Sequence, residues 1–302
     1  LTANTTGTQN TAVGANALDS NTTGTNNVAI GKSALSLDTA GARSVAVGVG
    51  ALENQNFTSG TTTGNTAIGF TALQDTTTGL NNTGVGYAAL EANTTGVNNN
   101  AIGSSAGAAN TTGDYNNVLG EAALLSNTTG SSNVAIGGSA LRANTTANDN
   151  VGIGESALRA NTTGARNTAL GKHALNLATT GDDNTAIGTN AMSNAVVTGN
   201  DNTALGRSAG YNVTSGANNT FLGHDAGYTG SPGGNITTAS NEICLGDENV
   251  SSANIQVDWT VASDQRDKTD FTALDLGLDF VKALAPVTYK WDKRSKYGDK
   301  SA

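Results

Sequence analysis

The segment Asn27-Val28-Ala29-Ile30-Gly31 decides the fold, because related segments recur along most of the chain. Its glycine falls at positions 14, 31, 48, 69, 86, 103, 120, 137, 154, 171, 188, 206, 223 and 246. Ten of the thirteen intervals are 17 residues, and the other three are 21, 18 and 23 residues. The extra residues are polar and rich in glycine, as expected for loops. A fixed period of this kind predicts a repeat architecture of fourteen units.

Each position within the repeat has its own residue type. The residue before the glycine is always Val, Ile or Leu, from Val13 to Leu245, and a small residue, mostly Ala, precedes it. We interpret this alternation as a short strand whose aliphatic face is buried. Ala and usually Leu follow three and four residues after the glycine, as in Ala17 and Leu18, which predicts a second short strand. Asn-Thr-Thr-Gly then forms a turn, in which we expect Asn and Gly to adopt positive φ.

These features predict an all-β fold, a β-solenoid or β-roll with one 17-residue repeat per coil. Gly, Asn and Thr disfavour helix, and helical repeats are longer. Fourteen stacked coils would extend ~65 Å, whereas three interleaved chains would extend about three times further. Because one coil buries few aliphatic side chains, we expect the Ala and Leu columns to pack three chains around a threefold axis as a homotrimer.

Composition excludes several classes of function. The net charge is −9, with −10 on residues 1–262 and +1 on residues 263–302, so we expect no nucleic-acid partner for the acidic shaft. The single Cys244 allows no intrachain disulfide, and no apolar run is long enough for membrane insertion. His173 and His224 lie two and one residues after their glycines, so we interpret them as loop residues and predict no metal site and no cofactor.

The last forty residues differ from the repeats. Charged residues become dense, residues 276–284 predict a short amphipathic helix that ends before Pro286, and residues 287–291 predict a strand. We therefore divide the chain into a β-repeat shaft (1–250), a junction (251–262) and a partial α+β domain (263–302). We expect that domain to be truncated, and the natural N-terminus to lie upstream of Leu1.

A family resemblance rests on three motifs of this last region: Ser263-Asp-x-Arg-x-Lys268, Gly277-Leu-Asp-Phe280 and Leu284-x-Pro286-Val-x-Tyr289-x-Trp291. They resemble the self-cleaving intramolecular chaperone at the C-terminus of phage tail fibres and endosialidases. That resemblance implies a trimer that directs assembly of the fibre before it and then releases itself. The repeats also resemble the heads of trimeric autotransporter adhesins, although their period of 17 is longer than the adhesin unit.

The resemblance implies one chemical event per chain. Cleavage would fall between Ala262 and Ser263, with Ser263 as the nucleophile and Lys268 as its base, while Asp264 and Arg266 shape the site. A lysine accepts the serine proton when burial lowers the lysine pKa. We expect no metabolic activity, and the acidic residues change column from repeat to repeat, which disfavours a paired-carboxylate glycosidase site.

The sequence therefore predicts a structural fibre shaft for host or surface attachment, located in a virion as part of a tail fibre. Expected partners are two further copies of the chain, other tail or fibre proteins, and a host surface glycan or protein. The alternative is a bacterial surface adhesin or extracellular filament, at the cell surface, that uses the same repeats.

Overall fold

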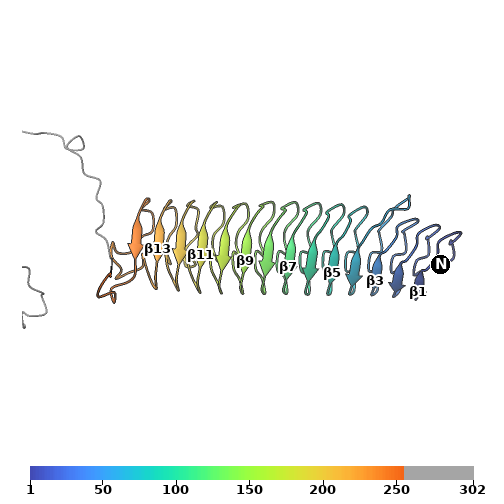
Figure 1. The fold of residues 1–302 in the computed structure, drawn as a ribbon, viewed down its shortest axis with the longest axis horizontal. Coiled ribbons are helices and arrows are strands. Elements are labelled where there is room, and N and C mark those ends of the chain that lie inside the picture. Colours follow the sequence, from blue (N-terminus) through green and yellow to red (C-terminus); the bar gives the residue numbers. More distant parts are fainter. Residues whose placement is uncertain (255–302) are drawn as a thin grey trace, which may run out of the picture. The chain divides into compact units, whose positions relative to one another are not determined.

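The computed structural model describes residues 1–254, which form a parallel β-solenoid (Figure 1). Each coil contributes one three-residue strand, and each strand pairs with the strands of the adjacent coils in sequence order. The strands are β1 (Thr11–Val13), β2 (Val28–Ile30), β3 (Val45–Val47), β4 (Thr66–Ile68), β5 (Thr83–Val85), β6 (Asn100–Ile102), β7 (Asn117–Leu119), β8 (Val134–Ile136), β9 (Val151–Ile153), β10 (Thr168–Leu170), β11 (Thr185–Ile187), β12 (Thr203–Leu205), β13 (Thr220–Leu222) and β14 (Ile243–Leu245). The predicted all-β solenoid is confirmed.

Equivalent residues of successive repeats lie side by side. Val13 pairs with Ile30 across β1 and β2, and Val47 pairs with Ile68 even though 21 residues separate these two positions. Insertions therefore lengthen loops without changing the register of the sheet. One repeat makes one coil within a single chain, and the coils Leu1–Ser252 form one compact unit.

The buried face of each strand is the opposite of the one expected. The middle residue points into the coil and is buried, as with Ala29 and Ala101, whereas the aliphatic residue before the glycine lies outside and is exposed or half-buried. Ile102, for example, keeps 46% of its surface exposed. The interior beside the strand accommodates mainly small side chains, so the larger residues of the strand lie outside.

The Ala and Leu columns are also placed differently from the prediction. Ala17, Leu18 and most of their equivalents are buried inside the coil, so they form the core and cannot pack against another chain. The predicted second strand is a turn, and Leu18 has a left-handed backbone with a φ of 50°. Such a conformation costs a branched residue on the order of 1 kcal/mol, which burial of the leucine side chain offsets.

One part of the core shows compensation between columns. Phe221 replaces the usual Ala of the strand and is fully buried. Glycines occupy the leucine position in its own coil (Gly227) and in the preceding coil (Gly210). A Cβ at Gly227 would collide with the Phe221 ring. The volume removed from the leucine column is thus refilled from the strand, as close packing requires.

Two columns of buried asparagines hold successive coils in register. In the turn column, Asn110 Nδ2 donates to Asn93 Oδ1 at 3.0 Å and to the Gly113 carbonyl at 3.0 Å. In the column before the strand, the Asn82 backbone N–H donates to Asn65 Oδ1 at 2.9 Å. Each amide thereby satisfies polar groups of its own coil and of a neighbouring coil, as buried polar groups must.

The turn after the leucine requires glycine because a side chain would not fit there, and not because the backbone needs a positive φ. Neither Asn21 nor Gly24 adopts a positive φ, contrary to the expectation, and the left-handed residue is Asn26. A Cβ at Gly24 would collide with the Gly41 carbonyl oxygen of the next coil. Glycine is required there because the backbones stack closely.

Asp38 interrupts the turn column of asparagines. Its carboxylate accepts hydrogen bonds from the backbone N–H of Phe57 at 2.9 Å and from Gln55 Nε2 at 3.1 Å. It has no amide to donate to the preceding coil, and Asn21 Oδ1 is buried without a partner. Burial raises the pKa of Asp38, although these hydrogen bonds oppose the rise.

Substitutions on the two sides of β6 test the orientation of the strand. Ala101→Leu is expected to destabilise the solenoid by about 1–3 kcal/mol, because it overpacks the interior. Ile102→Val should cost less, at most about 1 kcal/mol, because it removes a single methylene group from a side chain that lies outside the coil interior. Denaturant titration followed by circular dichroism measures both, and the reverse ranking would show that the aliphatic column lies inside.

Asp38→Asn is expected to stabilise the shaft at pH 7 by about 1 kcal/mol, because the removal of a buried charge and the new donor for Asn21 Oδ1 outweigh the hydrogen bond that Gln55 Nε2 loses. A raised folded pKa contributes stability that is present below the unfolded value of 3.8 and is lost as pH rises through the folded pKa. The advantage of the variant should therefore shrink at pH 3.

Asn127→Asp is the matched control, since it creates the same interruption in an intact part of the column. It should lower the thermal unfolding midpoint of the shaft at pH 7. The midpoints of both variants and of the parent chain are measured at pH 7 and at pH 3. Equal midpoints for Asp38→Asn and the parent chain at pH 7 would contradict this explanation of the column.

Candidate functional sites

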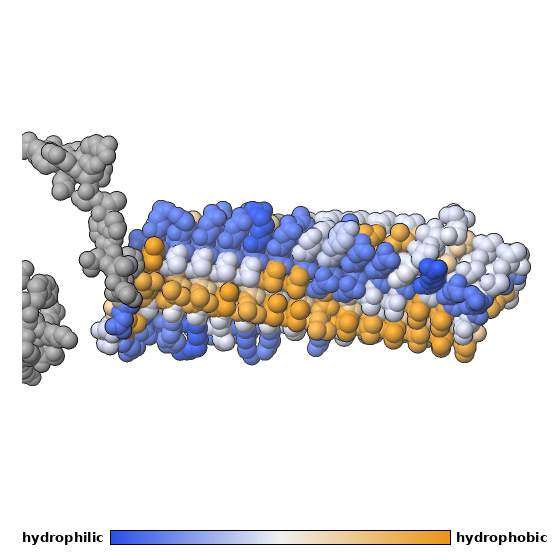
Figure 2. All heavy atoms as spheres, viewed as in Figure 1, coloured by the Kyte–Doolittle hydropathy of each residue, from blue (hydrophilic) through white to orange (hydrophobic). Residues whose placement is uncertain are grey.

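The outward face of the strands extends along the whole series of coils. It consists of the first and third residues of β1 to β14, and the third residue is Val, Ile or Leu in every strand. Nine of these third residues are at least 39% exposed: Val13, Ile30, Ile68, Ile102, Leu119, Leu170, Leu205, Leu222 and Leu245. Figure 2 shows a hydrophobic band along the solenoid.

The same face carries no charge. Charged residues make up 13% of the chain, yet every first strand residue is Thr, Val, Asn or Ile, and every third residue is aliphatic. The face is about 65 Å long and about 7 Å wide, given the spacing of strands and of alternate residues. Its area of several hundred Å² reaches the size at which an apolar patch usually marks an interaction site.

A second feature is the column of residues that follow the repeat glycine. Side chains in this column meet their equivalents in the next coil, so Lys172 Nζ lies 2.7 Å from Glu155 Oε2. Phe70 stacks on Tyr87 with ring centroids 5.7 Å apart. The column is exposed, and its pairs are set by the stacking of the coils. Ion pairs at such exposure contribute little to stability.

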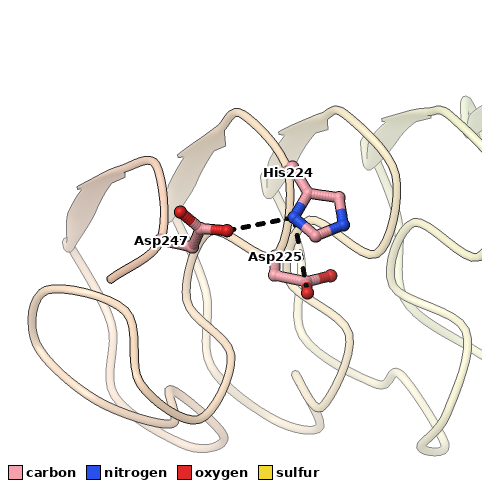
Figure 3. A group of neighbouring side chains, drawn as sticks. All are labelled: His224, Asp225 and Asp247. Atoms are coloured by element: carbon pink, nitrogen blue, oxygen red, sulfur yellow. Dashed lines mark hydrogen bonds and ion pairs between the residues drawn. The ribbon is translucent and has the colours of Figure 1, made fainter. Parts of the chain in front are cut away.

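At the C-terminal end of this column, His224, Asp225 and Asp247 converge (Figure 3). His224 Nδ1 lies 3.1 Å from Asp247 Oδ2 and 3.4 Å from Asp225 Oδ2. Asp247 is held by Asn249, whose backbone N–H donates to Oδ1 and whose side chain donates to Oδ2. Hydrogen bonds from His224 and Asn249 lower the pKa of Asp247, so it is a carboxylate at neutral pH.

Sequence reasoning missed this cluster. His224 and Asp247 occupy the same column, but the 23-residue interval between their glycines conceals the relation. Aligning the repeats on their glycines would have placed Arg207, His224 and Asp247 in adjacent coils. His173 lies in a different column and is not part of the cluster, as its position in the repeat indicated.

The residues predicted for self-cleavage, Ala262, Ser263, Asp264, Arg266 and Lys268, lie outside the described residues. The predicted helix at 276–284 and strand at 287–291 also lie outside them. These assignments stay predictions. In the part of the chain that the structure describes, no helix is long and apolar enough to cross a lipid bilayer.

Comparison with known families identifies the end of the chain. Residues 263–301 match the family model described as the chaperone of endosialidase. The match begins at Ser263, the first residue of the motif on which the resemblance rests. No curated protein matches the chain. The findings thus assign a chaperone-type segment to the C-terminal region that follows the β-solenoid.

Proposed function

We propose that this chain is the shaft of an attachment fibre, assembled as a homotrimer and followed by an intramolecular chaperone that releases itself. The observation that carries the proposal is the succession along one chain of a fourteen-strand solenoid and a chaperone-of-endosialidase segment. A regular solenoid provides length and rigidity. Its function is then mechanical, holding a recognition surface away from a virion, as part of a tail fibre, or away from a cell.

The outward face supports the trimer. Since the Ala and Leu columns are buried in the core of each coil, copies would pack on the outward face instead. Isoleucine, valine and leucine side chains repeat at the strand spacing of about 4.8 Å. Two parallel copies have the same spacing, so the side chains of one copy can fit between those of the other along the whole face. Burial of this face removes apolar surface from water along the whole shaft.

Charge supports the same assignment. The chain carries a net charge of −9, so most surfaces of two copies repel each other at close range. The outward face is the exception, because its strand positions contain no ionisable side chain. Copies that meet on this face keep their acidic residues in water, which avoids the cost of burying unpaired charges.

The chaperone segment would act once in each chain. In this proposal neutral Lys268 accepts the hydroxyl proton of Ser263, whose oxygen attacks the carbonyl carbon of Ala262. The peptide C–N bond breaks as the amine takes up a proton, and water hydrolyses the resulting ester. Asp264 and Arg266 shape the site. Release after folding would leave a fibre that cannot easily re-form from unfolded chains, since its assembly domain is gone.

The outward face is tested by placing a charge on it. Ile102→Asp is expected to weaken association of the copies by more than about tenfold, because the trimer would bury three unpaired carboxylates. Thr95→Asp adds the same charge at an exposed turn position and should leave association unchanged. Analytical ultracentrifugation measures both. A monomeric parent chain, or equal association in both variants, would contradict the assignment of this face.

Self-release is tested by the intact denatured mass of a chain expressed with its complete C-terminal domain. The parent chain should lose everything after Ala262, Ser263→Ala should stay whole, and Lys268→Gln should be cut more slowly. An uncut parent chain would contradict self-release and would favour a surface adhesin or extracellular filament with a permanent trimerisation cap.

A further inference from the structure

We propose that His224, Asp225 and Asp247 bind one divalent transition-metal ion of the zinc class, which joins the last two coils of the solenoid. The three side chains come from the segments that follow β13 and β14 (Figure 3). An ion that is bound by side chains of two coils therefore fastens the final coil to the one before it. This inference is independent of the proposed fibre function.

The donor set selects the class of metal. One imidazole nitrogen with two carboxylate oxygens suits Zn²⁺, Co²⁺, Ni²⁺ and Mn²⁺, whereas Mg²⁺ and Ca²⁺ prefer oxygen ligands alone. Three protein ligands leave at least one coordination position to solvent. Two carboxylate ligands provide negative charge beside the cation.

The separations of His224 Nδ1 from the two carboxylate oxygens match those in a coordination shell. Bond lengths of about 2.0–2.1 Å place neighbouring ligand atoms about 3.4 Å apart in a tetrahedral shell and about 3.0 Å apart in an octahedral one. His224 Nδ1 lies 3.1 Å and 3.4 Å from the two carboxylate oxygens. All three donor atoms lie within 4.8 Å of one another.

The backbone and the outer hydrogen bonds hold the ligands in place. The Asp225 backbone N–H donates to the Arg207 carbonyl of the preceding coil at 3.0 Å, and the Tyr228 N–H donates to the Asp225 carbonyl at 3.0 Å. Asn249 holds both oxygens of Asp247. Groups that orient ligands in this way commonly contribute tenfold or more to metal affinity.

Arg207 opposes the metal. Its guanidinium contacts His224 Nε2, and because a guanidinium can only donate, Nε2 accepts and Nδ1 carries the proton. Metal binding at Nδ1 displaces that proton and moves the hydrogen to Nε2, so the Arg207 side chain must turn away. Removal of the guanidinium should consequently tighten metal binding. If the cluster served only to form ion pairs between coils, removal of Arg207 would not be expected to produce metal binding.

The test is a competition titration of the untagged 302-residue chain with Zn²⁺ and a chromophoric chelator. The chain contains two histidines, so His173→Ala is a matched control for His224→Ala. The parent chain and His173→Ala should each bind one equivalent. His224→Ala and Asp247→Asn should bind at least about tenfold more weakly, and Asn249→Ala also more weakly.

Arg207→Gln should bind Zn²⁺ more tightly than the parent chain, and circular dichroism checks that every variant keeps its fold. Co²⁺ should give the visible absorption of a coordinated ion in the parent chain and lose it in His224→Ala. No stoichiometric binding by the parent chain, or equal affinity in His224→Ala and His173→Ala, would overturn the proposal.

Discussion

The whole solenoid depends on the stacking of each coil on its equivalent one repeat later. Backbone hydrogen bonds of the strands join adjacent coils, and the buried asparagines join them again on both sides of the turn. Where the turn column is interrupted, the consequence is visible in single atoms. Asn21 Oδ1 precedes Asp38 and Asn161 Oδ1 precedes Ala178, and both oxygens are buried without a hydrogen-bond partner. The column is therefore cooperative, since each amide needs the one in the following coil.

The period of the repeat predicts most of this architecture from sequence alone. Glycines such as Gly31 recur because their φ is positive and because a Cβ would collide with the next coil, so their spacing marks the coils reliably. The prediction of which face of the strand is buried is wrong. The rule that the largest apolar residue is buried fails at Ile102, because Leu90 and Ala106 already fill the interior. Periodicity alone cannot decide which face of a three-residue strand has room inside.

The candidate sites show the same division between what sequence reveals and what needs the fold. The motif beginning at Ser263 can be recognised from the sequence alone, and it coincides with the start of the family match. The outward face became apparent only when the core was located, since a buried and an exposed aliphatic column have the same sequence pattern. His224 and Asp247 are 23 residues apart; the repeat glycines place both in one column, and the structure shows that their side chains meet.

In the proposed fibre, each chain coils on itself and copies associate through their outward strand faces. The most direct test is the length of the assembled shaft, measured by electron microscopy of the purified protein. Fourteen coils at about 4.8 Å per coil predict a rod of about 65 Å. A shaft about three times as long would show that strands of different chains alternate along the fibre, and it would contradict the assignment of one coil to each repeat.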